Sequence, residues 1–307
     1  MAMKDVVPVL ITCDIDPTPE VCLENKKHAI TLTMELFEEY GIKSTFLFVA
    51  NMAKLFNSEI KKLQHDGHEI GCHGLTHHEE EEYNRLPEGI QREYLTTATK
   101  ILEDLTEHPM RSFRGPRVKT SHITHKILEE LNYSADCSVC SQRIDLVSSN
   151  LINTGWIFAP RLPYHPSINS AFKKGTRRIV VVPVSAIVLP FISGTLYIFG
   201  LQFMKKLFDI LYLESKKSGK PIVYLMHPAE FVKHTKEIVH KPSLSAIRAR
   251  GFYFRRKLKL FRDENKRLHY TIKLFEYMRK FADIKFMTVN HYVESITHNE
   301  CNVPLSH

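Results

Sequence analysis

The chain has 307 residues, of which 43% are hydrophobic and 25% are charged, and its formal net charge is +8. This composition is typical of a packed globular protein and excludes an intrinsically disordered one. The length suits one large α/β domain, so we expect residues 1–307 to form a single domain. The first apolar run, from Val6 to Thr12, is too short for a signal-peptide core and lacks a basic leader, which predicts a strand in a cytoplasmic protein.

Short apolar runs alternate along the chain with stretches in which apolar residues recur three or four positions apart. In chain order, the predicted elements are a strand at 7–16, a helix at 29–40 that Gly41 ends, a strand at 44–50, a helix to about 66, a strand at 68–72, a helix at 94–105, a strand at 112–114, a helix at 123–131, strands at 133–139 and 179–188, a helix at 204–215, and strands at 221–226 and 285–289. This alternation predicts parallel strands with crossover helices, in a barrel or an open wound sheet.

Two segments interrupt the alternation. Residues 141–178 are rich in Pro, Ser and Asn and contain Trp156, the only tryptophan, so we expect a long functional loop over one end of the sheet. The 26 residues from Ile179 to Met204 include no charged residue. This stretch contains prolines and glycines and begins with β-branched residues, which favours a segment buried in the protein core. The alternative interpretations are a patch that contacts a membrane surface and a membrane-spanning segment.

Basic residues gather near the C-terminus. Ten Lys or Arg and only two acidic residues lie between Lys241 and Arg267, so this segment alone has a net charge of +8. We expect a basic helical segment over about 241–282. Such a face can bind phosphate, an anionic membrane or nucleic acid, and the simpler interpretation is a solvated helix surface.

We expect the six cysteines to be reduced thiols. Cys137 and Cys140 form a C-x-x-C pair, but a zinc or redox role would need a second pair or a thioredoxin-like context. We therefore expect no special role for this pair.

Polar side chains stand at or just after the ends of several predicted strands. In parallel α/β sheets and barrels these ends share one rim, where active sites gather. The residues are Asp14 and Asp16, His73 and His77, Arg114, Asp136, and His227.

These residue types favour metal chemistry. Asp14 and Asp16 are two apart, so both face the same side of a strand, and a divalent cation would relieve their repulsion. His73 and His77 are four apart and can converge on one ion. Two imidazoles and one carboxylate leave a position for a water whose pKa the metal lowers. The second carboxylate could act as base, and a neighbouring cation such as Arg114 would keep it ionised.

Five segments together resemble the motifs of the polysaccharide deacetylases, which are carbohydrate esterase family 4 and share a nodulation-protein-B homology domain. The segments read TCDID at 12–16, GHEIGCHGLTH at 67–77, FRGP at 113–116, YSADCS at 133–138 and LMHP at 225–228. The resemblance spans nearly the whole chain, and it implies a distorted (β/α) barrel of about seven strands.

The resemblance also implies roles for individual residues. It makes Asp14 the base, with Arg114 orienting it, and His227 the acid. Asp16, His73 and His77 would be the metal ligands, with zinc as the default ion and cobalt, nickel or manganese as alternatives. Three further residues would bind substrate or support the site: Pro116, Arg117, whose backbone N–H could serve as an oxyanion donor, and Asp136, which would orient His227 or Arg114.

Some positions depart from the family pattern. Ile15 separates the two aspartates, Gly74 stands where many members have Ser or Thr, and Arg117 stands where many have Tyr. These departures resemble intracellular branches of the superfamily, which include lipid-linked aminosugar deformylases and cyclic-amide hydrolases related to allantoinase.

The leading hypothesis is therefore a metal-dependent hydrolase that removes an acetyl or formyl group from an amino sugar in glycan biosynthesis. A lipid-linked sugar would suit both the uncharged stretch and the basic segment, with peripheral contact at an anionic inner membrane face; nucleic acid is not an expected partner. The alternatives are a cyclic-amide hydrolase and a non-catalytic binding protein on the same fold.

Overall fold

A parallel sheet forms the centre of the protein. The computed structural model describes residues 6–141, 155–234 and 263–301. All the pairings within the main sheet are parallel. Its strands lie in the order β11 (Ile222–Met226), β1 (Val7–Ile15), β2 (Ser44–Phe48), β3 (Glu69–Cys72), β4 (Ser112–Phe113), β5 (Ala135–Asp136) and β8 (Val180–Val181), and β12 (Ile284–Phe286) pairs with the start of β1.

Strand β1 is the central strand, and all nine of its residues are buried. Its N-terminal end pairs with β12, its middle with β11 and its C-terminal end with β2. A parallel strand that is covered on both faces needs a nearly continuous apolar sequence, which explains the run from Val7 to Ile15.

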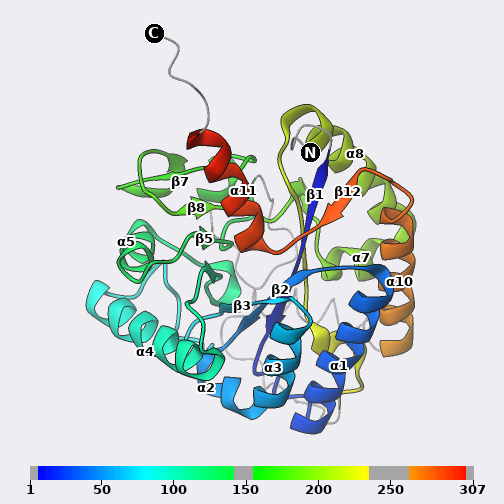
Figure 1. The fold of residues 1–307 in the computed structure, drawn as a ribbon, viewed down its shortest axis with the longest axis horizontal. Coiled ribbons are helices and arrows are strands. Elements are labelled where there is room, and N and C mark those ends of the chain that lie inside the picture. Colours follow the sequence, from blue (N-terminus) through cyan, green and yellow to red (C-terminus); the bar gives the residue numbers. More distant parts are fainter. Residues whose placement is uncertain (1–5, 142–154, 235–262, 302–307) are drawn as a thin grey trace, which may run out of the picture.

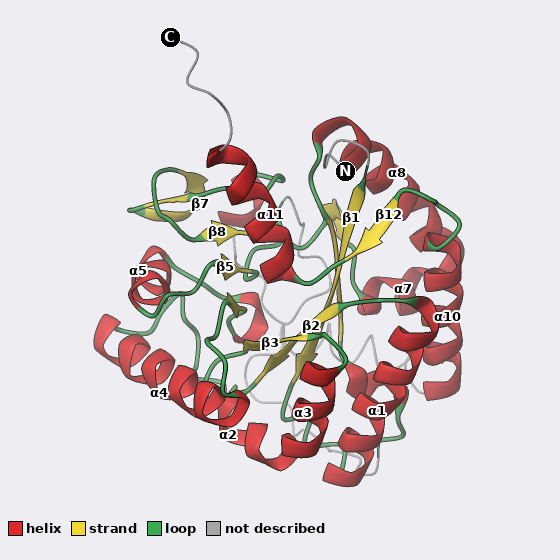
Figure 2. Cartoon of the chain, viewed as in Figure 1, coloured by secondary structure: helices red, strands yellow, loops and turns green. Residues whose placement is uncertain are grey.

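Helices surround the strands, as the red ribbons of Figure 2 show. In Figure 1, α2, α3, α1, α10 and α8 form an arc on the outside of the sheet. The longest helices of the described residues are α1 (Leu23–Tyr40), α4 (Glu88–Thr106) and α8 (Leu201–Ser218). Shorter helices include α2 (Ala50–Ala53), α3 (Asn57–His65), α5 (His122–Glu130), α10 (Glu264–Met278) and α11 (Val289–Cys301). Helix α1 ends at Gly41, which adopts the left-handed conformation with φ of 63°.

The sheet curls until its two ends meet. After β8, the backbone N–H of Ser185 donates to the carbonyl of Val223 in β11 at 3.2 Å, and the N–H of Val223 donates to the Ser185 hydroxyl at 2.9 Å. The N–H of Leu225 reaches the carbonyl of Phe191 at 3.4 Å. Because the closing segment is irregular, the result is a distorted (β/α) barrel, as the sequence resemblance implied.

The two segments that interrupt the pattern contain more structure than the sequence indicates. Within 141–178, where we expected a loop, the described part forms α6 (Gly155–Phe158) and a hairpin of β6 (Pro166–Ser167) and β7 (Ser170–Lys174). That loop prediction was thus too simple, because the segment pairs with itself. The stretch 179–204 includes β8, the hairpin of β9 (Ala186–Ile187) and β10 (Leu189–Pro190), and α7 (Ser193–Phe199).

Most side chains of 179–204 are buried, including Ile179, Val182, Phe191 and Met204. Their burial agrees with the core interpretation of this stretch. Among the described residues, no helix has the length and apolar character needed to cross a membrane. Of the predicted basic helical segment, residues 241–262 lie outside the described residues, and the remainder forms α10.

Candidate active site

The polar residues singled out from the sequence come together at the carboxyl ends of the strands. Asp14 lies in β1 and Asp16 directly follows it, His73 follows β3, Arg114 follows β4, and His227 follows β11. Because β1 pairs directly with β11 and β2, and β3 lies beside β2, these ends are neighbours on one rim.

Asp16, His73 and His77 form a cluster that can hold one metal ion. Oδ1 of Asp16 lies 3.2 Å from Nε2 of His73 and 3.7 Å from Nε2 of His77, and the three ligand atoms all lie within 4.8 Å of one another. Ligand atoms about 2.1 Å from a tetrahedral ion are roughly 3.4 Å apart. The spacing therefore fits an ion such as zinc.

Two further observations support that fit. Oδ1 of Asp16 is buried and has no hydrogen-bond partner, although a buried carboxylate oxygen without a partner is costly. Nδ1 of His73 lies 2.7 Å from the carbonyl oxygen of Arg114. An acceptor at that position selects the tautomer with the proton on Nδ1, which leaves the Nε2 lone pair directed at Asp16.

The charges around Asp16 keep it ionised. Burial alone would raise the pKa of this carboxyl, but the close contact with His73 and the charges of His77 and His227 hold the pKa far below its usual range. An ionised carboxylate is the form that binds a cation.

His77 reaches the cluster from a loop, whereas the helical zinc sites that suggested the four-residue spacing present both histidines on one helix. His77 has a left-handed backbone with φ of 61°. The buried carboxylate of Glu81 fixes the loop, because it accepts hydrogen bonds from the backbone N–H groups of Leu75, Thr76 and His77, each at 2.7 Å. It also accepts from the Thr76 hydroxyl at 2.7 Å and from the Tyr83 hydroxyl at 2.8 Å.

Glu81 explains why residue 74 is a glycine. Gly74 has φ of 79°, and a Cβ atom there would lie 2.5 Å from Oε1 of Glu81 and 2.9 Å from Cδ of Pro116. The glutamate therefore occupies the space that a Ser or Thr side chain would need. No sequence pattern indicates this role, because Glu81 lies in a run of four glutamates that resembles a solvated acidic surface.

The second carboxylate, Asp14, is held by a buried arginine. Nη1 of Arg114 lies 2.6 Å from Oδ1 of Asp14, and the two side chains are 0% and 3% exposed. Arg114 also donates to the hydroxyl of Thr12 at 3.0 Å and to the carbonyl of Cys137 at 3.0 Å. The other oxygen of Asp14, Oδ2, lies 3.9 Å from Nε2 of His73. One carboxylate oxygen of Asp14 is thus held by Arg114, and the other lies beside the cluster.

His227 completes the group from the opposite side. Its Nε2 lies 3.5 Å from Oδ2 of Asp16, and its Nδ1 lies 3.4 Å from Oε1 of Glu230. Burial lowers the pKa of His227, but the hydrogen bond to Glu230 and the charge of Asp16 outweigh it and raise the pKa to about 10. A cation bound at Asp16 would oppose that rise by repelling the imidazolium.

The structure places Asp136 in a separate buried group. Its Oδ2 lies 2.7 Å from Nε2 of His125, and its Oδ1 accepts from the backbone N–H of Ser138 at 2.9 Å and also from the Ser138 hydroxyl. Ser138 in turn accepts from the N–H of Gly115 at 2.8 Å. Asp136 therefore supports the backbone next to Arg114, and its contacts do not include His227.

Pro116 and Arg117 form the short helix η3 (Pro116–Val118) after β4. Arg117 has φ of 56°, and its side chain donates to the carbonyls of His78, Glu79 and Glu81. Its side chain therefore braces the loop that presents His77.

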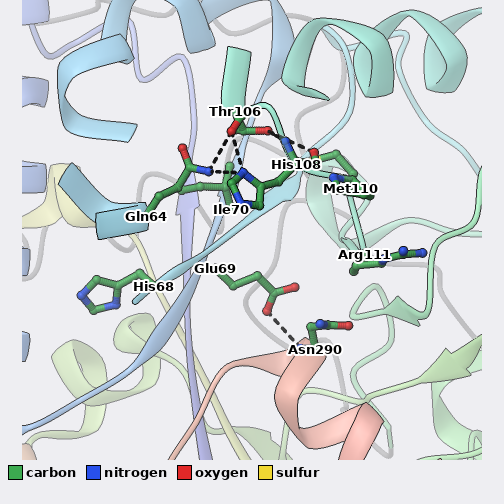
Figure 3. Close-up of a pocket in the computed structure, with 10 residues that line it drawn as sticks. Gln64, His68, Glu69, Ile70, Thr106, His108, Met110, Arg111 and Asn290 are labelled. Atoms are coloured by element: carbon green, nitrogen blue, oxygen red, sulfur yellow. Dashed lines mark hydrogen bonds between the residues drawn. The ribbon is translucent and has the colours of Figure 1, made fainter. Parts of the chain in front are cut away.

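A pocket away from the cluster has a volume of about 220 Å³ and is lined by Gln64, Glu69, His108 and Asn290, among others (Figure 3). Glu69 begins β3, so the pocket lies at the amino end of the sheet, opposite the cluster. Its polar groups pair with one another: Glu69 accepts from the N–H of Asn290 at the start of α11, and the amide of Gln64 lies 3.2 Å from the His108 ring.

Comparison with known proteins agrees with this geometry. Residues 5–135 match the family model described as polysaccharide deacetylase. A peptidoglycan deacetylase from Helicobacter pylori is 24% identical over 106 residues, which are 34% of this chain and 35% of that protein. The match thus spans about a third of the length of that relative.

Solved structures share the fold. A protein from Mycobacterium smegmatis described as a polysaccharide deacetylase superposes with a TM-score of 0.63 at 15% identity, covering 96% of this chain and 91% of the other. The Puue allantoinase superposes with a TM-score of 0.62, also at 15% identity, covering 98% and 93%. The segment 5–135, which is similar to the polysaccharide deacetylase family model, includes both aspartates, both cluster histidines and Arg114, so the similarity covers the residues of the cluster.

Proposed function

We propose that this protein is a metal-dependent hydrolase that removes an N-acyl group, acetyl or formyl, from an amino sugar. The observation that carries the proposal is the partnerless, buried Oδ1 of Asp16, which lies between two imidazole nitrogens and next to a second carboxylate. The similarity of residues 5–135 to the polysaccharide deacetylase model and to a peptidoglycan deacetylase supports a hydrolase that acts on amides of carbohydrates.

Asp16, His73 and His77 would hold the cation. When bound, a divalent ion supplies Lewis acidity and favours the ionisation of water at neutral pH. Two imidazoles and one carboxylate suit zinc best, and cobalt, nickel and manganese accept the same ligands.

The surrounding residues would handle the protons. As a water oxygen adds to the acyl carbon, Asp14 accepts the proton of that water, and Arg114 keeps Asp14 in place and ionised. When the C–N bond breaks, His227 donates a proton to the nitrogen, so that the products are a carboxylic acid and a free amine.

We further propose a substrate at an anionic membrane surface, such as an amino sugar carried on a lipid phosphate. Because most side chains of 179–204 are buried, this stretch no longer supports a membrane-surface substrate. The support comes from the basic segment between Lys241 and Arg267. Each lysine or arginine near an anionic surface contributes about 1 kcal/mol. The protein should therefore sediment with phosphatidylserine vesicles at low salt and not at high salt, and the absence of binding at low salt would contradict the membrane step alone.

A combined experiment tests the enzymatic proposal. Purified protein is analysed for bound metals and then assayed for release of acetate or formate from free, nucleotide-linked and lipid-linked amino sugars, with a hydantoin ring as the competing substrate. We expect about one divalent ion per chain and turnover of an N-acylated sugar that a chelator abolishes. Turnover of the hydantoin alone would favour a cyclic-amide hydrolase, and a protein that binds no metal and turns over neither substrate would favour a binding protein.

A further inference from the structure

We propose that Glu230 is the positioning residue that orients His227 as the proton donor, a role that rests on the proposed hydrolytic function. Glu230 lies in the short helix η4 (Pro228–Phe231), one turn after His227, and its backbone N–H donates to the carbonyl of His227 at 3.0 Å. This turn brings the carboxylate back to the imidazole, where Oε1 lies 3.4 Å from Nδ1.

Two buried hydroxyls from helix α7 fix the carboxylate. The hydroxyl of Ser193 donates to Oε1 of Glu230 at 2.9 Å, and the hydroxyl of Tyr197 donates to Oε2 at 3.3 Å. Ser193 is 1% exposed and Tyr197 is 2% exposed, so neither hydroxyl readily exchanges its partner for water. The fold therefore fixes the position of the Glu230 carboxylate, and the orientation of the His227 ring follows from that position.

The consequence for His227 is a defined ring orientation. An acceptor at Nδ1 holds that nitrogen protonated, and the ring then directs Nε2 toward Oδ2 of Asp16, 3.5 Å away, and toward the cluster. Without Glu230 the imidazole can rotate and exchange tautomers. Asp136, the other candidate to orient His227, has both oxygens engaged by His125 and Ser138, which leaves Glu230 as the carboxylate in contact with Nδ1.

Kinetics distinguish this role from a structural one. The variants are Glu230→Ala, His227→Ala and the double variant, with Glu93→Ala on the exposed face of α4 as the matched control. For an N-acetylated sugar that the wild type accepts, Glu230→Ala should lower kcat about 100-fold with little change in KM or zinc content. For 4-nitrophenyl acetate, whose leaving group needs no proton, the rate should hardly change.

The double variant supplies the decisive comparison. If Glu230 acts through His227, the double variant loses no more activity than His227→Ala alone, whereas independent roles would multiply the two losses. Multiplied losses, or an equal loss on the amide and the ester, would overturn the proposal.

A readout that needs no turnover separates this proposal from the proposed function. In zinc-loaded protein labelled with ¹⁵N-histidine, the His227 signals are identified by their absence in His227→Ala. We expect a protonated, hydrogen-bonded Nδ1 in the wild type and in Glu93→Ala, and a tautomer mixture in Glu230→Ala. An unchanged His227 spectrum in Glu230→Ala would refute the positioning role, and a changed spectrum in a protein that hydrolyses no amide would refute only the proposed function.

Discussion

Replacing Glu81 by glutamine should weaken both the fold and the metal site. The Glu81 side chain receives five hydrogen bonds, from the backbones of Leu75, Thr76 and His77 and from the hydroxyls of Thr76 and Tyr83. Glutamine has a single acceptor oxygen, so its NH₂ group must face donors that the carboxylate now satisfies. Glu81 is 1% exposed, so water cannot readily take over.

The magnitude follows from this count. If two of the charge-assisted bonds are lost at about 1.5 kcal/mol each, the free energy of unfolding falls by about 3 kcal/mol. Because His77 is held by the same bonds, up to the same free energy can be lost from metal binding, which corresponds to about a 100-fold weaker zinc affinity. Glu79→Gln, two residues earlier in the same loop and exposed, is the matched control.

The pH dependence has a definite sign. Burial would raise the pKa of Glu81, but the hydrogen bonds outweigh it and lower the pKa from its ordinary value of 4.5. A lowered pKa means that the stabilising contribution is present above about pH 4.5 and is lost as the pH falls toward the folded-state value. The wild type should therefore lose stability in that window, while Glu81→Gln should lose less.

Urea unfolding of chelator-treated protein and zinc titration against a competing chelator measure the two effects. The reasoning would be refuted by a Glu81→Gln variant that unfolds at the wild-type urea concentration and binds zinc with wild-type affinity. A stable variant with weakened zinc binding would show that the loop serves the site alone.

Three further predictions use other parts of the site. Asp14→Asn should abolish turnover and leave zinc binding largely intact; loss of zinc together with activity would mean that the two aspartates have the opposite roles. Gly74→Ala should cost about 2 kcal/mol in urea unfolding, because φ is positive and the new Cβ would meet Glu81, whereas Gly89→Ala, whose Cβ meets nothing within 4 Å, should cost nothing. Among Cys13, Cys22, Cys72, Cys137 and Cys140, only the exposed Cys22 should react with a thiol reagent in the native protein, because the other four are buried.

The sequence was most informative where burial forces a simple pattern. The strand predicted at 7–16 is β1, Val7–Ile15, because a strand covered on both faces has to be apolar throughout. It was less informative where the sheet is short and irregular: the strand predicted at 133–139 is only Ala135–Asp136. Helix α7 was not predicted, because a helix buried on most sides lacks the polar face that marks an amphipathic one.

Most of the site residues that the sequence indicated stand at or just after a strand end, namely Asp14, Asp16, His73, Arg114 and His227. Strand ends can be placed from apolar patterns, and the parallel topology then gathers them on one rim. Glu81 and Glu230 do not stand at strand ends, so the same reasoning could not identify them. Each follows a histidine by three or four residues, and its role depends on a turn that brings its carboxylate back: to the backbone around His77 in one case, and to the imidazole of His227 in the other.

Glu81 also accounts for one of the departures from the family pattern. Where a Ser or Thr was expected after His73, Gly74 leaves room for the carboxylate of Glu81. Asp136, which the resemblance implied would orient His227 or Arg114, contacts His125 and Ser138, and the carboxylate that contacts the His227 ring is that of Glu230. In both cases the position of a carboxylate depends on a turn in the chain, and the motif residues at 67–77 and 225–228 do not include either glutamate.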